Sequence, residues 1–584
     1  MRVDYVTPDA ADLVILGATP GGITAAIAAA WLSRTSVIIE RTSFIGGLPA
    51  NGLGATDIAT RGATGGLFLE FVRRIKAHYV HAYGHDSDQV RHCDNGYHFE
   101  PSVAESVFRN WLSEYPQIRV LYRRQFDFED ENVAKEGEKI TSISVVNLED
   151  DVGATETIRG RFFLDCTYEG DLIAAAGVPF FLGREGREVY GEIGAGRLYK
   201  KWNGPECAGS TGSGDNAVQA YNYRLCMTNN PDNRVEVRCP ASYNRQEYAS
   251  LVYDVKSGQH TGAWPVISDD QVAENLRRAE RNQRPVPNKL GGIRRLLSNV
   301  TLPNSKVDGN NQHYAFISTD LPEENWPYAT SSWYWRDRFA RRLREYTEGL
   351  FYFAQNDPEL PQWFRDECRR WGWAKDEYIE NGHFPRQIYV REGRRMKGRY
   401  VFTANDVLPQ HKTGNQGGDG DGDGHNFQDQ ATPHSTTITA SHYALDSHAV
   451  RKREAGRVHL DGFFSYRCPP YSVPYGVMVP DAPVSNLLSP VAVSASHVGF
   501  STLRMEPAWM ALGQAAGTAA ALCLGEEGQI PAESVDMDRL QRTLLGQGAV
   551  LIYDRRLWED GVDDEARKKM QWEWLQDIKR REQK

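Results

Sequence analysis

The sequence predicts an α/β protein built on a parallel sheet, with a second, α+β unit inserted into it. Three observations lead to this fold class. The first is a strand, helix, strand pattern near the start of the chain: apolar residues 13–16, an alanine-rich helix over about 21–32, and apolar residues 37–39. The second is the length of 584 residues, which exceeds the usual size of one hydrophobic core. The third is a change of composition near residue 183, where tryptophan, tyrosine and arginine become dense.

The turn between the first strand and its helix carries most of a dinucleotide-binding fingerprint. Gly17 and Gly22 occupy the outer glycine positions, whereas Thr19 stands at the middle one. Pro20 and Gly21 keep the turn short, and proline suits the first turn of a helix, where its missing donor costs nothing. We expect the N–H groups of this helix to face a diphosphate, whose charge the helix dipole favours. The alternative is an ordinary glycine-rich turn.

An acid and a glycine-rich loop follow the second strand. Glu40 ends that strand at the spacing expected of a carboxylate that accepts hydrogen bonds from ribose hydroxyls. The loop over 41–58 contains four glycines, which would let its backbone run close to a flat ligand, although a mobile surface loop is the alternative. A later apolar strand ends in Asp165, Cys166 and Thr167. We expect it to return the chain to the same sheet, with an ordinary strand-to-helix turn as the alternative.

Composition and charge argue against several other classes of function. The net charge of −10 and the lack of a basic tract argue against nucleic acid or an anionic membrane as the main partner. No apolar run approaches the length of a membrane span, and the first residues lack the regions of a secretory signal. The eight cysteines are scattered without ligand-like spacing, so we expect buried thiols in a reducing, cytoplasmic compartment and no metal site.

The predicted domain organisation is discontinuous. Residues 1–182 form the first part of the nucleotide-binding domain, and residues 183–440 form the inserted substrate domain. Residues 441–548 return to the first domain with a helix of small and apolar residues, and residues 549–584 form a helical tail. Within the insert, the low-complexity stretch 412–427 spaces its aspartates like a calcium loop. It lacks the bidentate glutamate at the twelfth position, so we interpret it as a flexible insertion.

Longer motifs resemble one family in particular. The glycine-rich loop after Glu40 and the strand end at Cys166 resemble the flavoproteins of the glutathione reductase type. The motifs GATPGGITAAIAAA (17–30), YVREGRRM (389–396) and SASHVGFSTLRMEP (494–507) resemble the FAD-dependent oxidoreductase family that is sometimes labelled xanthan lyase-like. The resemblance extends over nearly the whole chain. It implies a Rossmann-like FAD-binding domain of the glutathione reductase type, with FAD bound non-covalently.

The resemblance also places a set of residues against the cofactor. In flavoproteins of this type a late helix covers the flavin, which assigns that role to the helix after Pro507. A buried helix with a GxxxG-like face for tight packing is the alternative. The predicted cofactor-binding residues are Gly17, Thr19, Pro20, Gly21, Gly22, Glu40, Arg41, Gly46, Gly47, Leu48, Asn51, Gly52, Cys166, Thr167, Gly513, Gln514 and Ala516.

Five residues are candidates for the catalytic site, because a flavoprotein must orient its substrate and manage protons while the flavin supplies the redox chemistry. His497 is the predicted base for a hydroxyl proton, since the imidazole pKa lies near neutrality. Glu506 and Arg504 flank the same turn. Tyr389 and Arg391, on one face of a strand-like segment, would bind an anionic or polyhydroxylated group. Structural ion pairs and helix-dipole contacts are the alternative for all five.

The predicted function is FAD-dependent oxidation of a small oxygenated metabolite by hydride transfer to flavin N5. No second strand, glycine, helix unit follows the first, so we expect no separate NAD(P)H domain, and oxygen or an unknown acceptor would reoxidise the flavin. His442, Asp446 and His448 match no metal motif and are assigned hydrogen-bonding roles at a domain junction. One alternative is a flavin monooxygenase or non-redox isomerase of secondary metabolism. Another is a carbohydrate-binding or scaffold protein with a vestigial nucleotide site, which Thr19 would favour.

Overall fold

The computed structural model describes residues 5–6, 10–149, 153–202, 204–262, 266–408, 433–525 and 528–583. The low-complexity stretch 412–427, with its comparison to a calcium loop, lies outside the described residues. Among the helices within the described ranges, none is both long and apolar enough to traverse a bilayer.

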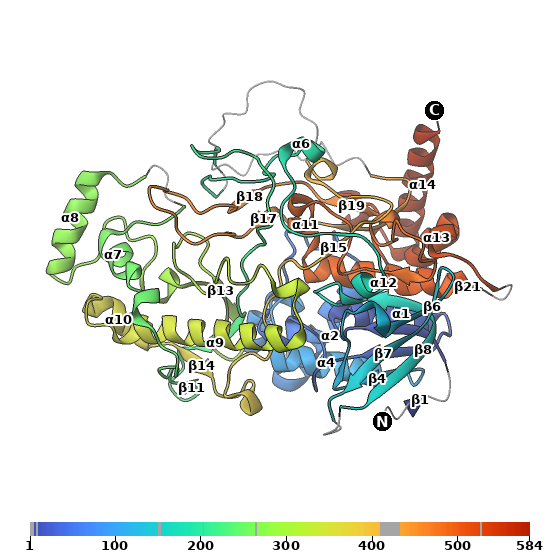
Figure 1. Ribbon diagram of the computed structural model, residues 1–584, viewed down its shortest axis with the longest axis horizontal. Coiled ribbons are helices and arrows are strands. Elements are labelled where there is room, and N and C mark those ends of the chain that lie inside the picture. Colours follow the sequence, from blue (N-terminus) through green and yellow to red (C-terminus); the bar gives the residue numbers. More distant parts are fainter. Residues whose placement is uncertain are drawn as a thin grey trace.

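A parallel sheet forms from segments that are far apart in the sequence (Figure 1). Its parallel strands, in spatial order, are β4 (Ile118–Leu121), β3 (Ser36–Ile39), β2 (Ala11–Leu16), β8 (Thr155–Asp165) and β20 (Leu487–Leu488). All of β3 and nearly all of β2 are buried, as continuous apolar strands are when both faces of a sheet are covered. The predicted α/β class with a parallel sheet is confirmed.

An antiparallel extension continues this sheet from the first half of β8. That half pairs with β7 (Lys139–Asn147), which pairs in turn with β5 (Arg124–Gln125) and β6 (Val133–Glu136). A short strand, β1 (Tyr5–Val6), pairs with β8 in parallel. The second half of β8 lies beside β2, so one long strand joins both parts of the sheet. Its C-terminal end brings Asp165 to the same edge as the end of β2.

Two helices from opposite ends of the sequence pack tightly beside the sheet (Figure 1). These are α1 (Pro20–Trp31) and α12 (Glu506–Cys523). A Cβ atom on Gly513 would lie 2.1 Å from the carbonyl oxygen of Gly21, and one on Gly517 would lie 2.0 Å from that of Ala25. The Thr24 hydroxyl donates a hydrogen bond to the backbone oxygen of Met510 at 2.8 Å. Only glycine at these two positions of α12 allows the helices to approach so closely.

A second sheet and its helices form the unit on the left of Figure 1. The sheet is antiparallel and lies within the range predicted for the insert. Its strands, in spatial order, are β11 (Arg234–Val235), β14 (Gly372–Ala374), β10 (Leu225–Thr228), β13 (Lys306–Asn311) and β12 (Leu297–Leu302). The helices of this unit are α7 (Ser250–Ser257), α8 (Asp269–Glu280), α9 (Trp333–Asn356) and α10 (Gln362–Arg369). The exact domain boundaries stay a prediction.

The segment 389–396 joins the two units through buried ion pairs. Its three arginines are almost completely buried. Each of them pairs with a carboxylate from another part of the chain: Arg391 with Asp320 at 2.8 Å, Arg394 with Asp171 at 2.7 Å, and Arg395 with Glu185 at 3.0 Å. Removing one partner of such a pair leaves an uncompensated buried charge, so the segment fixes how the units meet.

The remaining elements complete the cover of the first sheet and the end of the chain. The other helices are α2 (Gly66–Tyr83), α3 (Asp88–His92), α4 (Pro101–Ser113), α5 (Asp171–Ala175), α6 (Arg187–Tyr190), α11 (His497–Leu503), α13 (Met537–Gly546) and α14 (Asp564–Glu582). The other strands are β9 (Phe180–Phe181), β15 (Arg395–Met396), β16 (Thr437–Ser441), β17 (Leu445–Ser447), β18 (Phe464–Tyr466), β19 (Tyr471–Pro474), β21 (Leu524–Gly525) and β22 (Gly528–Gln529).

Substitution of Gly513 by alanine should destabilise the protein by about 1–3 kcal/mol, because the added methyl group must push α12 away from α1. Gly546 is a matched control, since it lies in a helix and a Cβ atom there would meet nothing within 4 Å. Urea unfolding of G513A and G546A measures the difference. Equal midpoints for the two variants would contradict the close contact between the helices.

Candidate functional site

A cavity of about 150 Å³, open to solvent on one side, lies at the carboxyl edge of the parallel sheet. Six of the predicted cofactor-binding residues line it: Gly17, Thr19, Glu40, Arg41, Gly47 and Thr167. Its opposite wall comes from the second unit and includes Tyr328, Trp333, Arg336 and Asp337. The crevice beyond the carboxyl ends of parallel strands is where open α/β sheets bind nucleotides. The two units therefore share this cavity between them.

The turn from β2 to α1 requires glycine at two positions. Gly17 has a φ of +98°, and a Cβ atom on it would lie 2.9 Å from the Cys166 carbonyl oxygen. A Cβ atom on Gly22 would lie 2.1 Å from the Gly17 oxygen. Gly21 instead faces α12, where its Cβ atom would lie 3.1 Å from the Trp509 oxygen. The outer glycines thus shape the turn itself, as the fingerprint predicts.

Thr19 replaces the middle glycine and caps the helix. Its hydroxyl accepts a hydrogen bond from the Gly22 N–H at 3.2 Å and donates one to the Cys166 carbonyl at 2.8 Å. Pro20 follows as the first residue of α1. A threonine N-cap satisfies one of the free N–H groups of a helix start, and proline at the next position lacks that N–H. Thr19 therefore supports the turn, which weakens the argument for a vestigial site.

Glu40 closes the turn from the side of β3. Its carboxylate accepts hydrogen bonds from the Ala18 N–H at 3.1 Å, and from the N–H and hydroxyl of Thr42 at 2.8 and 2.7 Å. Burial raises the pKa of this carboxyl, and the bonds from Thr42 and Ala18 oppose the rise. Because Glu40 also lines the cavity, it is placed to accept hydrogen bonds from a ribose.

Arg41 connects the sheet to the opposite wall. Its guanidinium lies 4.1 Å from the ring centroid of Trp333 at the start of α9. It also pairs with Asp337 at 2.6 Å and donates to the Gln125 side chain at 3.0 Å. Two of these contacts therefore hold α9 across the mouth of the cavity, beside the acid that would bind the ribose, and the third ties Arg41 to β5.

The glycine-rich loop runs from the cavity towards β10 of the second unit. Gly46, Gly47 and Gly52 all have positive φ angles. Gly47 lines the cavity, whereas a Cβ atom on Gly46 would meet the Phe108 ring at 2.6 Å and one on Gly52 would meet the Arg224 carbonyl at 2.0 Å. A Cβ atom on Gly47 would itself lie 2.3 Å from the Tyr168 hydroxyl, so contacts with protein require glycine at all three positions. Only Gly47 opens onto the space for a ligand among the three.

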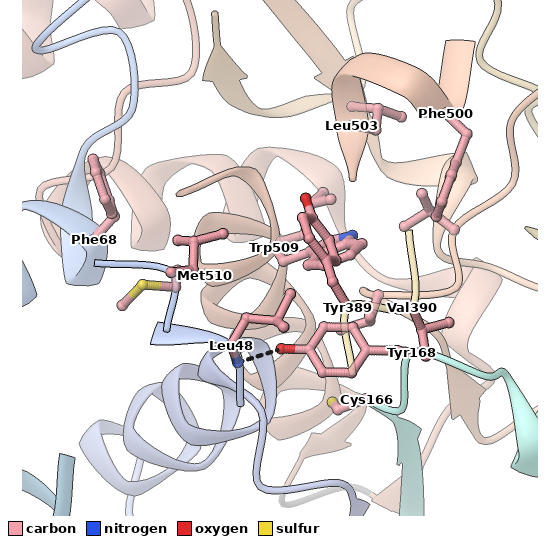
Figure 2. Packing of buried hydrophobic residues seen from close by; sticks show 14 of the residues in the cluster. Leu48, Phe68, Cys166, Tyr168, Tyr389, Val390, Phe500, Leu503, Trp509 and Met510 are labelled. Atoms are coloured by element: carbon pink, nitrogen blue, oxygen red, sulfur yellow. Dashed lines mark hydrogen bonds between the residues drawn. The ribbon is translucent and has the colours of Figure 1, made fainter. Parts of the chain in front are cut away.

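Asn51 carries the one polar side-chain atom of this loop that is buried without a partner in the described part of the chain, whereas the neighbouring Leu48 N–H has one. The Asn51 amide donates to the Gly47 oxygen at 2.7 Å, but its own Oδ1 is buried without a hydrogen-bond partner in the described part of the chain. The Leu48 N–H donates to the Tyr168 hydroxyl at 3.2 Å, as Figure 2 shows. A buried acceptor without a partner is costly, and a bound ligand can supply the donor. The loop therefore fits a bound cofactor.

The end of β8 contacts the turn between β2 and α1. The Cys166 side chain is buried and its carbonyl holds Thr19. The Thr167 hydroxyl donates to Asp165 at 2.7 Å and accepts from the Gly170 N–H at 3.0 Å. Burial raises the pKa of Asp165 to about 6. Thr167 lines the cavity, whereas Cys166 acts through its backbone.

The predicted flavin-covering residues of α12 contact protein instead. Gly513 faces α1, and Ala516 is fully buried in the core. Gln514 accepts a hydrogen bond from the Leu67 N–H at 2.8 Å and donates to Gln547 at 3.2 Å. These contacts match the alternative of a tightly packed helix. Contact between these three residues and a cofactor stays a prediction, with no support from their surroundings.

The His497 side chain is buried among protein groups. One ring nitrogen is 2.9 Å from a carboxylate oxygen of Glu392, and the other is 3.3 Å from the Ser447 hydroxyl. All three side chains are almost completely buried. Both ring nitrogens therefore already have partners, which argues against a role as a base. That role stays a prediction.

Three of the other predicted catalytic residues, Tyr389, Arg391 and Arg504, lie in one buried group of polar side chains, which we call the central polar cluster. It consists of Asp57, Arg224, Asp308, Asp320, Tyr389, Arg391, Tyr443, Asp446, His448 and Arg504. Arg504 donates to the Tyr389 hydroxyl at 2.8 Å and to the Asp446 backbone oxygen at 2.9 Å. The Arg391 guanidinium lies 4.7 Å from the Tyr389 ring centroid. Tyr389 and Arg391 thus share one face, as the sequence analysis expects.

Sequence analysis missed several members of this cluster. The Asp57 carboxylate is 21% exposed and lies 3.8 Å from Arg224, beyond hydrogen-bond distance. Burial raises its pKa, and the charge of Asp57 in turn raises the pKa of Tyr443 well above its usual value. His448 Nδ1 lies 2.8 Å from Asp320, while its Nε2 lies 3.9 Å from Asp446. Asp57 lies near the end of the predicted glycine-rich loop, and for His448 sequence analysis predicted only a hydrogen-bonding role at a domain junction.

The other residues of the predicted domain junction have structural partners. His442 contacts the Thr60 hydroxyl and the Cys468 carbonyl, each at 2.7 Å. Within the ranges that the structure describes, no group of three or more histidine, cysteine or acidic side chains is arranged to hold a metal ion.

A Rossmann-type sheet with a capped glycine turn and an acid after the second strand is the arrangement that dinucleotide-binding proteins share. The chain belongs to the FAD dependent oxidoreductase family, whose sequence model matches residues 12–544. The family, the enzyme class and the FAD cofactor that the motifs predict are thereby confirmed. A comparison with curated proteins finds no match.

Solved structures resemble only part of the chain. The p-nitrophenol 4-monooxygenase PnpA of Pseudomonas putida is 12% identical over 30% of this chain and 44% of its own, with a TM-score of 0.20. The FAD-complexed glycerol-3-phosphate dehydrogenase of Bacillus halodurans is 8% identical over 29% and 37%, with a TM-score of 0.21. THI4 of Thermovibrio ammonificans is 15% identical over 30% and 66%, with a TM-score of 0.20. The chain spans less than two thirds of each, and scores this low carry no argument about the reaction.

Substitution of Glu40 by alanine should weaken FAD binding by about tenfold or more, because a charged hydrogen-bond acceptor for the ribose is lost. Fluorescence titration of the apoprotein with FAD measures the dissociation constant. Glu131 is an exposed control for a change of charge alone.

Because Glu40 also holds the Ala18 N–H, E40Q keeps the side chain in place while removing its charge. We expect an intermediate affinity for E40Q and an unchanged one for E131A. An E40A protein that binds FAD as tightly as the wild type would contradict this placement of the ribose.

Proposed function

We propose that this oxidoreductase oxidises a small, uncharged, hydroxylated metabolite by hydride transfer to the N5 atom of FAD. The observation that carries the proposal is a run of interacting side chains that leads from the nucleotide cavity to the central polar cluster. Tyr168 lines the cavity and donates to Glu506, and Glu506 in turn interacts with Asp57 of the cluster. FAD supplies the electron acceptor when bound, so the residues of the cluster must bind the substrate and manage its proton.

The charges of the cluster support a neutral substrate. Its three guanidinium groups belong to Arg224, Arg391 and Arg504, and its four carboxyl groups to Asp57, Asp308, Asp320 and Asp446. The arginines already face carboxylates, most closely in the two-pronged pair of Arg224 with Asp308. An anionic substrate would add charge to a group with one carboxyl in excess. Of the anionic and polyhydroxylated ligands considered for Tyr389 and Arg391, the structure favours the second.

His448 is the proton acceptor that we propose within this cluster. Asp320 accepts from its Nδ1 at 2.8 Å, which fixes the tautomer with a free lone pair on Nε2. Burial and the guanidinium groups of Arg391 and Arg504 hold the pKa of His448 well below its usual value, so the imidazole is neutral at pH 7. A neutral imidazole oriented by a carboxylate is a suitable general base for a hydroxyl proton. His497 lacks a free nitrogen by comparison.

The electron acceptor and the compartment complete the proposal. We propose that oxygen or another external acceptor reoxidises the flavin, since the sequence contains one dinucleotide fingerprint. A reducing compartment such as the cytoplasm is supported by the eight cysteines, all of which are free thiols.

Anaerobic mixing of the FAD-loaded protein with a panel of compounds tests the reaction class. The panel contains benzyl alcohol, glycerol and D-glucose as neutral alcohols, L-lactate and glycolate as hydroxy acids, and benzylamine. We expect a neutral alcohol to bleach the visible absorbance of the flavin without oxygen. Bleaching by the acids alone would refute the argument from charge. Hydroxylation of a compound that needs both oxygen and added NADPH would instead identify a monooxygenase.

Substitution of His448 by glutamine should slow flavin reduction by about 100-fold or more, which is the usual contribution of a general base. H497Q is the matched control, because each histidine is buried and faces one carboxylate. Stopped-flow measurement with the alcohol that reduces the wild type gives both rates. We expect H497Q to keep a rate near that of the wild type, and the reverse order would return the role of the base to His497.

A further inference from the structure

Glu506 has one carboxyl oxygen that no group of the described chain satisfies. It is the first residue of α12, and its side chain is 3% exposed. Its Oε1 accepts a hydrogen bond from the Tyr168 hydroxyl at 2.6 Å. Its Oε2 is buried without a hydrogen-bond partner among the described residues. Buried polar atoms without partners are rare, so this oxygen indicates a group that binds here.

The direction of each hydrogen bond around Tyr168 decides where the proton of Glu506 lies. The Leu48 N–H donates to the Tyr168 oxygen, so the tyrosine uses its own hydrogen to donate to Oε1 of Glu506 (Figure 2 shows the contact with Leu48). Burial and the charge of Asp57 raise the pKa of Glu506 to about 8, against the opposing bond from Tyr168. The carboxyl is therefore protonated at pH 7. Since Oε1 is an acceptor, Oε2 carries the hydrogen.

Glu506 also lies on the path of the cofactor. On one side, Tyr168 lines the nucleotide cavity, and its hydroxyl is so close to Gly47 that a Cβ atom there would be 2.3 Å away. On the other side stands Asp57 of the central polar cluster. Figure 2 shows the Tyr168 hydroxyl directed at the Leu48 backbone, and the Tyr168 ring centroid lies 5.3 Å from that of Trp509. A dinucleotide that is anchored in the cavity and reaches the cluster must pass this carboxyl.

We propose that Oε2–H of Glu506 donates a hydrogen bond to the isoalloxazine ring of FAD, and that the Tyr168–Glu506 pair raises the reduction potential of the bound flavin. A donor stabilises the reduced ring more than the oxidised ring, because reduction adds electron density to its acceptor atoms. The N-terminus of α12 acts in the same direction through its dipole. This inference rests on the proposed path of FAD, and Glu506 acts on the cofactor rather than on the substrate.

The midpoint potential of the bound flavin tests this inference without any substrate. Dye-coupled reduction at pH 7 compares the wild type with E506L, which has no donor, and with E506Q, whose amide keeps one. We expect E506L to shift the reduction equilibrium about tenfold towards the oxidised form, which is about 30 mV for a two-electron couple. We expect E506Q to stay near the wild type. Y168F should have a midpoint potential near that of the wild type, because the acid hydrogen remains on the Glu506 carboxyl.

The dependence of the potential on pH gives a second readout. As pH rises through about 8, Glu506 loses its proton and places a negative charge beside the ring, so the wild-type potential should fall more steeply there. Tyr168 and Asp57 are the groups that act on this carboxyl, and neither is changed in E506Q. In E506Q the flavin potential should therefore show no steeper fall with pH near pH 8.

Two results would overturn the inference and leave the proposed function standing. One is an E506L protein that binds FAD with wild-type affinity and an unchanged potential. The other, which decides the matter if E506L does not fold, is an E506Q protein that keeps the wild-type slope near pH 8. A wild-type protein that takes up no FAD on titration would instead refute the proposed function together with this inference.

Discussion

The contact between α1 and α12 is the constraint on which the rest of this structure depends. Helix α1 starts at the predicted nucleotide-binding turn, and its other side lies against the backbone of a helix from the far end of the sequence. Glycine at 513 and 517 brings the two backbones together, and Thr24 bonds across them. The predicted nucleotide-binding turn is therefore supported by a helix that follows the whole insert in the sequence. Contacts of such large sequence separation make folding slow.

A second constraint lies in the buried charges between the units. The arginines of 389–396 pair with carboxylates from both units, and burial makes each pair expensive unless it is complete. This requirement fixes how the insert sits on the sheet. It also places Arg391 and Tyr389 beside Arg504, so the structural segment and the central polar cluster are continuous. The geometry of the site thus follows from the way in which the units are held together.

Local patterns were sufficient to predict the nucleotide turn. Gly17, Gly22 and Glu40 act within one βαβ unit, where spacing along the sequence determines position in space. The position of Thr19 at the start of the helix was also predictable, since a threonine before proline is a common helix start. Gly513 was ambiguous, because small residues serve equally to admit a ring or another helix. The convergence of Asp57, Asp320, Tyr443 and His448 was beyond sequence analysis, since three segments that are far apart in the sequence supply them.

Helix α9 affects access to the cavity at the edge of the parallel sheet. It belongs to the second unit, yet Trp333 and Asp337 hold Arg41 across the mouth of the cavity. A ligand bound behind that wall is held by both units at once, so a change in how the insert sits on the sheet would also change the opening of the cavity.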